Sequence, residues 1–219
     1  MKIKALIAVR SGSVRVEHKN IRAFAGTTLL DIKIRQLLAV NGLDGIVVNS
    51  NDEDILNIAR KYKVELVKRD DKYASNTVSM SDVYENMAQN IDTDVVMYSN
   101  VTNPLMRIDT IEKMIERFRE GGDFDSLNSV NSIKQFMYLD GKPINYDPMN
   151  QPRSQDLPDI VAINFAISLL SRAHMIEYKN VVGRKPELYT ISDIEAVDID
   201  TMLDFKTAEY LYKLEHLML

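Results

Sequence analysis

The amino-terminal stretch IKALIAV, residues 3–9, is followed directly by RSGSVRVEHKNIR, residues 10–22. The first stretch is short, apolar and bounded by a polar segment, which predicts a buried strand. In open α/β sheets, ligands bind beyond the carboxyl ends of the strands. The order of the two stretches therefore places a basic loop where such a sheet would hold an anion. The loop carries four basic residues and one acidic residue, namely Arg10, Arg15, Lys19, Arg22 and Glu17.

Strands and helices are expected to alternate through residues 1–125. Apolar residues at helical spacing predict the helices, and short apolar runs predict the strands. The first helix ends at Asn41-Gly42 and the last at Gly121-Gly122, because Gly commonly terminates a helix. This alternation predicts a parallel sheet with helices on both faces. The expected strands are residues 45–49, 65–67 and 94–98, and the expected helices are residues 29–40, 52–63, 81–90 and 110–120.

The alternation breaks at residues 126–160. Strand-like pieces at residues 128–130 and 136–139 precede the turn Asp140-Gly141, which is a hairpin signal. We therefore expect one domain, residues 1–219, with an inserted arm at residues 126–160. Strands are expected again at residues 160–170 and 196–199. A closing helix is expected at residues 201–217, where Thr201 and Asp204 have the spacing of a capping box.

Composition excludes several classes of protein. The chain has 219 residues, 27 basic and 32 acidic, for a net charge of −5, so it is a poor general binder of nucleic acid. It has no Cys, which excludes disulfides, thiolate catalysis and Cys-ligated zinc. Its longest apolar run, residues 160–170, is shorter than the roughly 20 residues that span a bilayer. No cleavage pattern of a signal peptide follows Met1, so we expect a soluble cytoplasmic protein that binds no membrane.

The basic loop has the residue types of a phosphate site. Ser11, Gly12 and Ser13 let backbone N–H groups approach an anion, and the basic side chains supply charge where a polyphosphate would lie. The loop matches neither the Walker A pattern nor Gly-x-Gly-x-x-Gly. A solvated basic loop without a ligand is the alternative.

Two acidic residues stand in Val197-Asp198-Ile199-Asp200. If this segment is a strand, Asp198 and Asp200 point to the same side. Two converging carboxylates suit Mg²⁺ that also binds phosphates. The alternatives are an exposed strand edge, or a role for Asp200 in capping the next helix.

Two polar stretches are further candidates. Residues 100–105 follow an expected strand, and their amide and hydroxyl groups suit either the edge of a base or a turn. Residues 151–158 include Arg153, which either clamps a carboxylate or lies in solvent. The three His residues form no pair with metal-ligand spacing, and neither Gly-x-Ser-x-Gly nor His-Glu-x-x-His occurs.

Taken in order, these stretches resemble the CMP-sialic acid synthetase (acylneuraminate cytidylyltransferase) family. The resemblance implies a Rossmann-like three-layer nucleotidyltransferase fold with a mostly parallel sheet and an inserted hairpin arm for dimerisation, hence a homodimer. It also implies transfer of CMP from CTP to the 2-hydroxyl of a 3-deoxy-2-keto sugar acid, such as sialic or legionaminic acid, with release of pyrophosphate. The matching patterns are Arg10-x-x-Ser13 with Lys19-Asn20, Thr102-Asn103-Pro104-Leu105, Gln151-Pro152-Arg153 with Leu157-Pro158, and Asp198-Ile199-Asp200-Thr201 with Leu203-Asp204.

The same resemblance assigns roles to residues. It implies catalytic roles for Arg10, Lys19 and Asp200, and Mg²⁺ as cofactor on Asp198 and Asp200. The sugar acid would meet Asn100, Arg153 and Asn164. The nucleotide would be bound by Arg10, Ser11, Gly12, Ser13, Arg15, Lys19, Arg69, Ser75, Thr77 and Val78.

Several positions depart from the family pattern. Val14 stands where the family usually has Lys, and we expect the adjacent Arg15 to compensate. Ala162 and Phe165 replace an Arg and a Gly, and Phe165 is expected to narrow the pocket; Met106 likewise replaces an Arg. The identity of the sugar acid therefore stays open. Two alternatives also stay open: a sugar-1-phosphate nucleotidyltransferase or related Asp-x-Asp glycosyltransferase, and a non-catalytic nucleotide-binding module.

Overall fold

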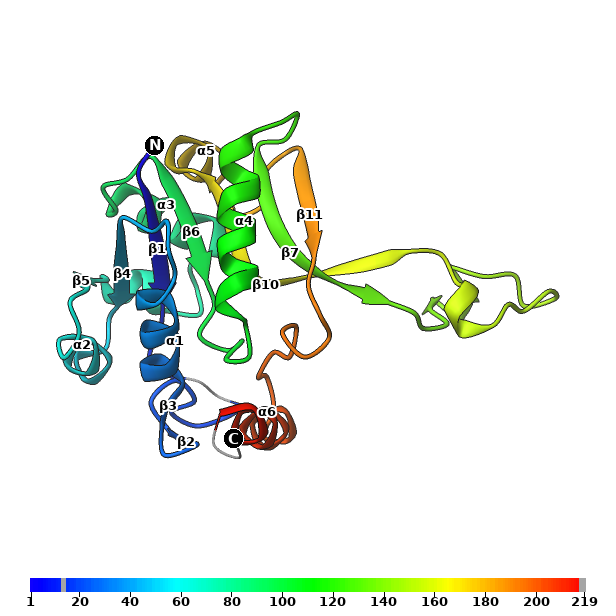
Figure 1. The fold of residues 1–219 in the computed structure, drawn as a ribbon, viewed down its shortest axis with the longest axis horizontal. Coiled ribbons are helices and arrows are strands. Elements are labelled where there is room, and N and C mark those ends of the chain that lie inside the picture. Colours follow the sequence, from blue (N-terminus) through cyan, green and yellow to red (C-terminus); the bar gives the residue numbers. More distant parts are fainter. Residues whose placement is uncertain (13–14, 217–219) are drawn as a thin grey trace.

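A seven-stranded sheet forms the centre of the molecule, in the order β11-β7-β10-β6-β1-β4-β5 (Figure 1). The computed structural model describes residues 1–12 and 15–216. Only β10 runs antiparallel to its neighbours in this sheet. The prediction of a mostly parallel sheet is confirmed. The strands are β1 (Ile3–Ala8), β4 (Gly45–Ser50), β5 (Glu65–Lys68), β6 (Val95–Ser99), β7 (Ser126–Ile133), β10 (Ile160–Ser171) and β11 (Pro186–Thr190).

Helices cover both faces of the sheet, as the alternation predicted. One face packs against α1 (Leu29–Leu38), α2 (Glu53–Ala59) and α4 (Ile108–Glu120). The opposite face packs against α3 (Met80–Gln89) and α5 (Arg172–Tyr178). The last helix, α6 (Met202–His216), lies beyond the carboxyl ends of the strands, next to the short strands β2 (Ala23–Phe24) and β3 (Thr27–Thr28) (Figure 1). None of the described helices is long and apolar enough to cross a bilayer.

Side chains of β1 are buried alternately on the two faces of the sheet, and this pattern places β1 in the interior of the sheet. Ile3, Ala5 and Ile7 are fully buried in the core on the α1 and α4 face, and Leu6 is fully buried on the opposite face. Alternate side chains of a strand point to opposite faces, so a strand that is apolar on both faces must lie inside the sheet. The chain leaves this strand at the carboxyl edge of the sheet and enters the basic loop there.

In the carboxyl-terminal third one prediction was wrong and two elements were missed. Residues 196–199 form a turn and a loop rather than a strand, and the edge strand is β11 instead. The Ile199 amide donates to the Thr102 carbonyl oxygen at 3.0 Å, in the loop after β6. Ile199 is fully buried, so the alternating apolar pattern reflects packing against the core without strand pairing. The short helix α5 was not predicted.

The segment in which the alternation of strands and helices breaks, residues 126–160, includes a projection from the sheet. The outer halves of β7 and β10 pair with each other, with Ile160 opposite Ile133, and lead into the small hairpin of β8 (Tyr138–Leu139) and β9 (Lys142–Pro143). Its turn residues Asp140 and Gly141 have φ values of 50° and 75°, the left-handed pair that a tight hairpin turn needs. Residues 134–159, the arm, extend away from the body of the molecule (Figure 1).

An aromatic cluster attaches α6 to the body. The Phe24 ring is fully buried, and its centroid lies 5.3 Å from that of Phe205, edge to face. At the start of the helix, the Asp204 amide donates to Thr201 Oγ1 at 3.2 Å, and Asp204 Oδ2 accepts from the Thr201 amide at 2.7 Å. The predicted capping box is therefore present. It fixes the direction in which the chain enters α6 from Asp200.

We predict that Phe205→Ala lowers the free energy of unfolding by about 3–5 kcal/mol, because it leaves a cavity against the Phe24 ring. The measurement is urea denaturation followed by circular dichroism. Leu203→Ala on the same helix is the matched control, since this side chain is 74% exposed and its removal should change stability by less than about 0.5 kcal/mol. Equal losses in the two variants would contradict this packing.

A buried lysine in α1 generates a second prediction. Lys33 is completely buried, and its Nζ donates to Gln36 Oε1 at 2.7 Å and to the Asn103 carbonyl oxygen at 2.9 Å. Burial lowers the pKa of Lys33 to about 7. An unfolded lysine has a pKa of about 10.4, so between these two values the unfolded chain binds more protons than the folded one.

The stability of the protein should therefore rise as the pH rises from 7 to 10, relative to a Lys33→Met variant that cannot titrate there. The expected slope of this difference is at most about 1.4 kcal/mol per pH unit. Urea denaturation of both proteins at pH 7, 8, 9 and 10 measures it, and every other titrating group cancels in the comparison. Parallel stability curves would show that Lys33 keeps an ordinary pKa.

Candidate functional site

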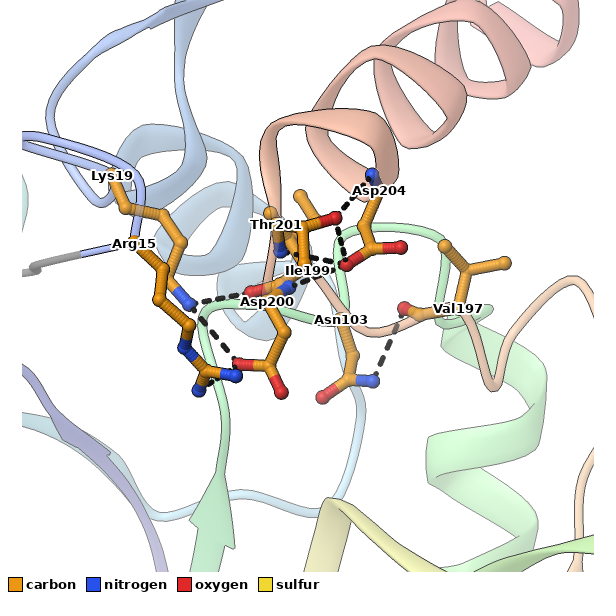
Figure 2. Close-up of polar contacts among 8 residues, drawn as sticks. All are labelled: Arg15, Lys19, Asn103, Val197, Ile199, Asp200, Thr201 and Asp204. Atoms are coloured by element: carbon orange, nitrogen blue, oxygen red, sulfur yellow. Dashed lines mark hydrogen bonds and ion pairs between the residues drawn. The ribbon is translucent and has the colours of Figure 1, made fainter.

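The basic loop meets the acidic segment at the carboxyl edge of the sheet (Figure 2). Lys19 Nζ donates to the Ile199 carbonyl oxygen at 2.5 Å and lies 3.8 Å from Asp200 Oδ1. Arg15 Nη2 forms an ion pair with the same Asp200 oxygen at 2.8 Å. The structure therefore brings together three residues that the sequence placed in one site.

The charges of Lys19, Asp198 and Asp200 interact with one another. Burial lowers the pKa of Lys19, although Asp198 and Asp200 act in the opposite direction. Asp198 is exposed, yet partial desolvation by the surrounding protein, followed by the neighbouring Asp200, raises its pKa. The nearby Thr102 side chain and Lys19 oppose that rise in pKa. A further cation beside the two carboxylates would lower their mutual repulsion.

The donor set here fits a magnesium ion that is shared with phosphates. Within residues 1–12 and 15–216, no group of three or more His, Asp or Glu side chains could hold a metal alone. Mg²⁺ commonly binds one or two carboxylates and takes its other ligands from water and substrate phosphates. The Asp198 and Asp200 pair meets that requirement even though the segment is not a strand.

A cavity of about 320 Å³ lies beyond the carboxyl ends of β1 and β6. Arg10 reaches across one side of it and donates to the Ala74 carbonyl oxygen and to Asn76 Oδ1, both at 2.8 Å. Several residues predicted for the nucleotide line this cavity, together with the buried Tyr98. The lining includes Arg10, Arg69, Ser75, Val78 and Tyr98.

Arg69 is a buried cation in this cavity. It is 4% exposed and donates to Asn49 Oδ1 at 2.6 Å and to the Asn49 carbonyl oxygen at 3.0 Å. Burial, followed by the nearby positive charge of Arg10, lowers the pKa of Arg69 to about 10. In the described part of the chain, neither Arg10 nor Arg69 forms an ion pair with a carboxylate. Two cations without a counter-charge make this cavity suited to an anionic or acceptor-rich ligand.

The cavity and the acidic segment lie at the same edge of the sheet. Ala8 and Tyr98, which line the cavity, stand at the carboxyl ends of β1 and β6, and the loop after β6 contacts the acidic segment through Thr102 and Ile199. Lys19 lies against Asp200, whereas Arg10 lines the cavity.

The rest of the predicted nucleotide residues lie around these groups. The Ser11 hydroxyl accepts from Asn51 Nδ2 at 3.2 Å, and Gly12 has a φ of 85°, which Gly adopts without strain. The Ser75 and Thr77 hydroxyls lie 3.0 Å apart. Ser13 and its neighbour Val14 lie outside the described residues.

The predicted sugar-acid residues are not gathered in one place. Arg153 lies in the arm, is 74% exposed and binds Asp156 Oδ2 at 2.7 Å, so within this chain it is separate from the site. Asn164 Oδ1 accepts from Ser129 Oγ at 2.6 Å and from the Ala166 amide at 3.2 Å. The Asn100 amide donates to the Ala166 carbonyl oxygen at 3.4 Å, which places Asn100 beside this part of β10.

Phe165 has an unusual backbone. Its φ is 54°, in the left-handed region that favours Gly, and the side chain is 36% exposed. This is the position where the family resemblance expects Gly. A positive φ costs Gly little, so the backbone angle at Phe165 is one that Gly would adopt without strain.

Three buried polar residues of the site were not predicted individually. Asn49 is the last residue but one of β4 and binds Arg69, Tyr98 is the last residue but one of β6, and Asn103 donates from Nδ2 to the Val197 carbonyl oxygen at 3.2 Å. Each follows or ends an apolar run at the carboxyl end of a parallel strand. That position is the signal that could have identified them.

A larger cavity, about 570 Å³, lies on the other side of the loop after β6, between α1 and α6. None of the predicted site residues lines it. The smaller cavity is therefore the better candidate for the nucleotide, because Arg10, Arg69, Ser75 and Val78 line it.

Comparisons with known proteins identify the family. A family model described as cytidylyltransferase matches residues 4–218. The chain is 28% identical to the pseudaminic acid cytidylyltransferase of Campylobacter jejuni, over 99% of this chain and 98% of that protein. It is also 28% identical to the N-acylneuraminate cytidylyltransferase of Oncorhynchus mykiss, over 94% of this chain but only 49% of that protein, so it spans about half the length of this relative.

A solved structure shares the fold. CMP:2-keto-3-deoxy-manno-octonic acid synthetase complexed with CTP aligns with a TM-score of 0.74 and 13% identity, over 98% of this chain and 100% of that one. The likeness confirms the Rossmann-like nucleotidyltransferase fold that the resemblance implied. Because the family model covers nearly the entire sequence, this chain belongs to the cytidylyltransferase family.

Proposed function

We propose that this chain transfers CMP from CTP to the 2-hydroxyl of a 3-deoxy-2-keto sugar acid and releases pyrophosphate. The proposal rests on one observation above all: Arg10 and Arg69 line a single cavity without carboxylate partners in the described residues, at the same edge of the sheet as Asp198 and Asp200. A nucleoside triphosphate with its metal supplies the missing negative charge. Membership in the cytidylyltransferase family selects CTP.

The nucleotide is oriented by two sets of residues. Arg69, Ser75 and Val78 face the cytosine, whose ring nitrogen and carbonyl oxygen accept hydrogen bonds that a buried guanidinium can donate. Arg10, Arg15 and Lys19 lie toward the triphosphate. The contacts that Arg15 and Lys19 make with Asp200 keep these cations close to the acidic pair before a ligand enters.

Charge neutralisation and orientation carry the chemistry. The 2-hydroxyl of the sugar acid attacks the α-phosphorus in line, and pyrophosphate leaves. Arg10 and Lys19 stabilise the negative charge that develops on the leaving group. Asp198 and Asp200 would hold Mg²⁺, which when bound offsets charge on the phosphates. Neither Cys nor His is needed for this reaction.

The sugar acid is proposed to lie between Asn100 and Asn164, with its carboxylate bound by Arg153. Arg153 stands on the arm and can reach a site only when the arm packs against a second copy of the chain. The arm exposes apolar side chains that such packing would cover: Tyr138 is 56% exposed, Leu139 63% and Met149 92%. We therefore propose a homodimer in which each arm completes the partner's site.

The proposed substrate class is supported by the names of relatives that match 94% and 99% of this chain. Their names specify N-acylneuraminate and pseudaminic acid, which are nonulosonic acids. We expect Mg²⁺-dependent pyrophosphate release from CTP with at least one nonulosonic acid in a panel that includes sialic, legionaminic, pseudaminic and octulosonic acids. UTP and GTP should not replace CTP.

The same assay separates the alternatives. Turnover with a sugar 1-phosphate in place of every sugar acid would favour a sugar-1-phosphate nucleotidyltransferase. Binding of CTP without pyrophosphate release from any acceptor would favour a non-catalytic nucleotide module. Either result would reject the proposed acceptor class.

Two substitutions should have different kinetic effects. Asp200→Asn removes one of the two carboxylates that are proposed to hold Mg²⁺ beside the phosphates, so kcat should fall by about 10²–10³-fold. Arg69→Met removes a donor to the base, so KM for CTP should rise while kcat changes less. Steady-state kinetics of pyrophosphate release measure both effects.

The matched control for the acid is Asp109→Asn. Asp109 is an exposed carboxylate on α4 that pairs with Lys113 at 3.1 Å, away from the cavity, and its loss should leave both kinetic constants unchanged. If Asp200→Asn behaves like this control, the acidic pair has no part in the reaction.

A further inference from the structure

The buried amine of Lys33 is not used by the proposed reaction. In the described residues it has no carboxylate partner, and its two acceptors are Gln36 Oε1 and the Asn103 carbonyl oxygen. Burying an amine costs stability that a side chain of similar size without charge would not lose. The second acceptor, the Asn103 carbonyl oxygen, lies in the loop after β6, and this loop contacts the acidic segment.

Asn103 stands at the centre of the loop between β6 and α4. Its side chain is completely buried, and Nδ2 donates to the Val197 carbonyl oxygen at 3.2 Å (Figure 2). The preceding residue, Thr102, accepts from the Ile199 amide at 3.0 Å through its carbonyl oxygen. The loop thus holds the acidic segment on both sides of Asp198.

Two hydrogen bonds from α1 reach the backbone of this loop. Lys33 binds Asn103 at one end of the turn, and Gln36 Nε2 donates to the Met106 carbonyl oxygen at the other. The turn also packs into the core, since Leu105 is 2% and Met106 3% exposed. The two bonds from α1 act on main-chain carbonyl oxygens, so they orient the backbone of a loop whose apolar side chains are already buried.

We propose that Lys33 is a positioning residue: its side-chain amine orients the loop after β6, and this loop orients the segment that carries Asp198 and Asp200. A hydrogen bond joins Lys33 to Asn103, and a second joins Asn103 to Val197. The adjacent residue Thr102, linked to Asn103 by the peptide bond, accepts a third from the Ile199 amide. The proposal deepens the proposed function, since the segment that it positions is the one assigned to the metal and phosphates.

The experiment measures amide hydrogen exchange of Ile199 by NMR in the full chain. Its amide reports directly on the contact between the loop and the acidic segment. In Lys33→Met, which keeps the length of the side chain but donates nothing, exchange of the Ile199 amide should become about tenfold faster, the effect of losing one ordinary hydrogen bond. The Val9 amide, which binds the Asn49 carbonyl oxygen at 3.0 Å outside this path, should keep its rate.

Ile34→Val is the control variant. Ile34 is the next residue of α1 and completely buried, but it has no polar atom that could bind the loop. It should leave the exchange of both amides within about twofold of the wild type. Lys33→Gln retains an amide donor on a shorter side chain, so exchange of the Ile199 amide should be slower in it than in Lys33→Met. If Lys33→Met does not fold, Lys33→Gln is compared with the wild type instead.

A second readout is the kinetics of pyrophosphate release. Loss of positioning should lower kcat in Lys33→Met by about tenfold with little change in KM for CTP, because the nucleotide cavity does not contain Lys33. The same exchange rate of Ile199 in Lys33→Met and in Ile34→Val would overturn the proposal, whatever the kinetics. If the wild-type chain transfers nothing from CTP, the proposed function fails, and the exchange measurement still decides the role of Lys33.

Discussion

The contact of Lys19 with the acidic segment is the interaction on which the site depends. It joins a loop that leaves the first strand to a segment 180 residues later, just before the last helix. Neither partner is held there by regular secondary structure. The loop after β6 holds the segment at Ile199, just before Asp200. The capping box of Thr201 and Asp204 holds it just after Asp200. The position of Asp200 is therefore set by three separate parts of the chain.

Uncompensated charge is the second constraint. Arg69 and Lys33 are both buried without a carboxylate in the described structure, and burial lowers the pKa of each. The two cases differ in what lies beside them. Arg69 faces a cavity, and an anionic or acceptor-rich ligand there would offset the cost of burying its guanidinium. Lys33 faces only protein acceptors, and its hydrogen bonds to Gln36 and Asn103 offset part of the cost of burying its amine.

The sequence was informative wherever the physical signal is local. The apolar strand at residues 3–9, the basic loop after it and the capping box of Thr201 and Asp204 all follow from neighbouring residues, and the structure contains each of them. The strand predicted at residues 196–199 failed because burial of Val197 and Ile199 against the core imitates the period of a strand. The sequence could not predict the burial of Lys33, since its acceptor Asn103 is 70 residues away and only the fold brings the two together.

The bulge in β10 explains why one strand serves both the core and the arm. Between the pairs Ile163 with Val130 and Ser168 with Asn128, β10 has residues 164–167 where β7 has only Ser129. Phe165 takes a positive φ inside this bulge, at a cost of about 1–2 kcal/mol for a residue with a side chain. The hydrogen bonds that Asn164 accepts from Ser129 and from the Ala166 amide offset that cost. The direction of the arm and the floor of the proposed sugar-acid site are thus set by the same few residues, so a substitution in the bulge would change both together.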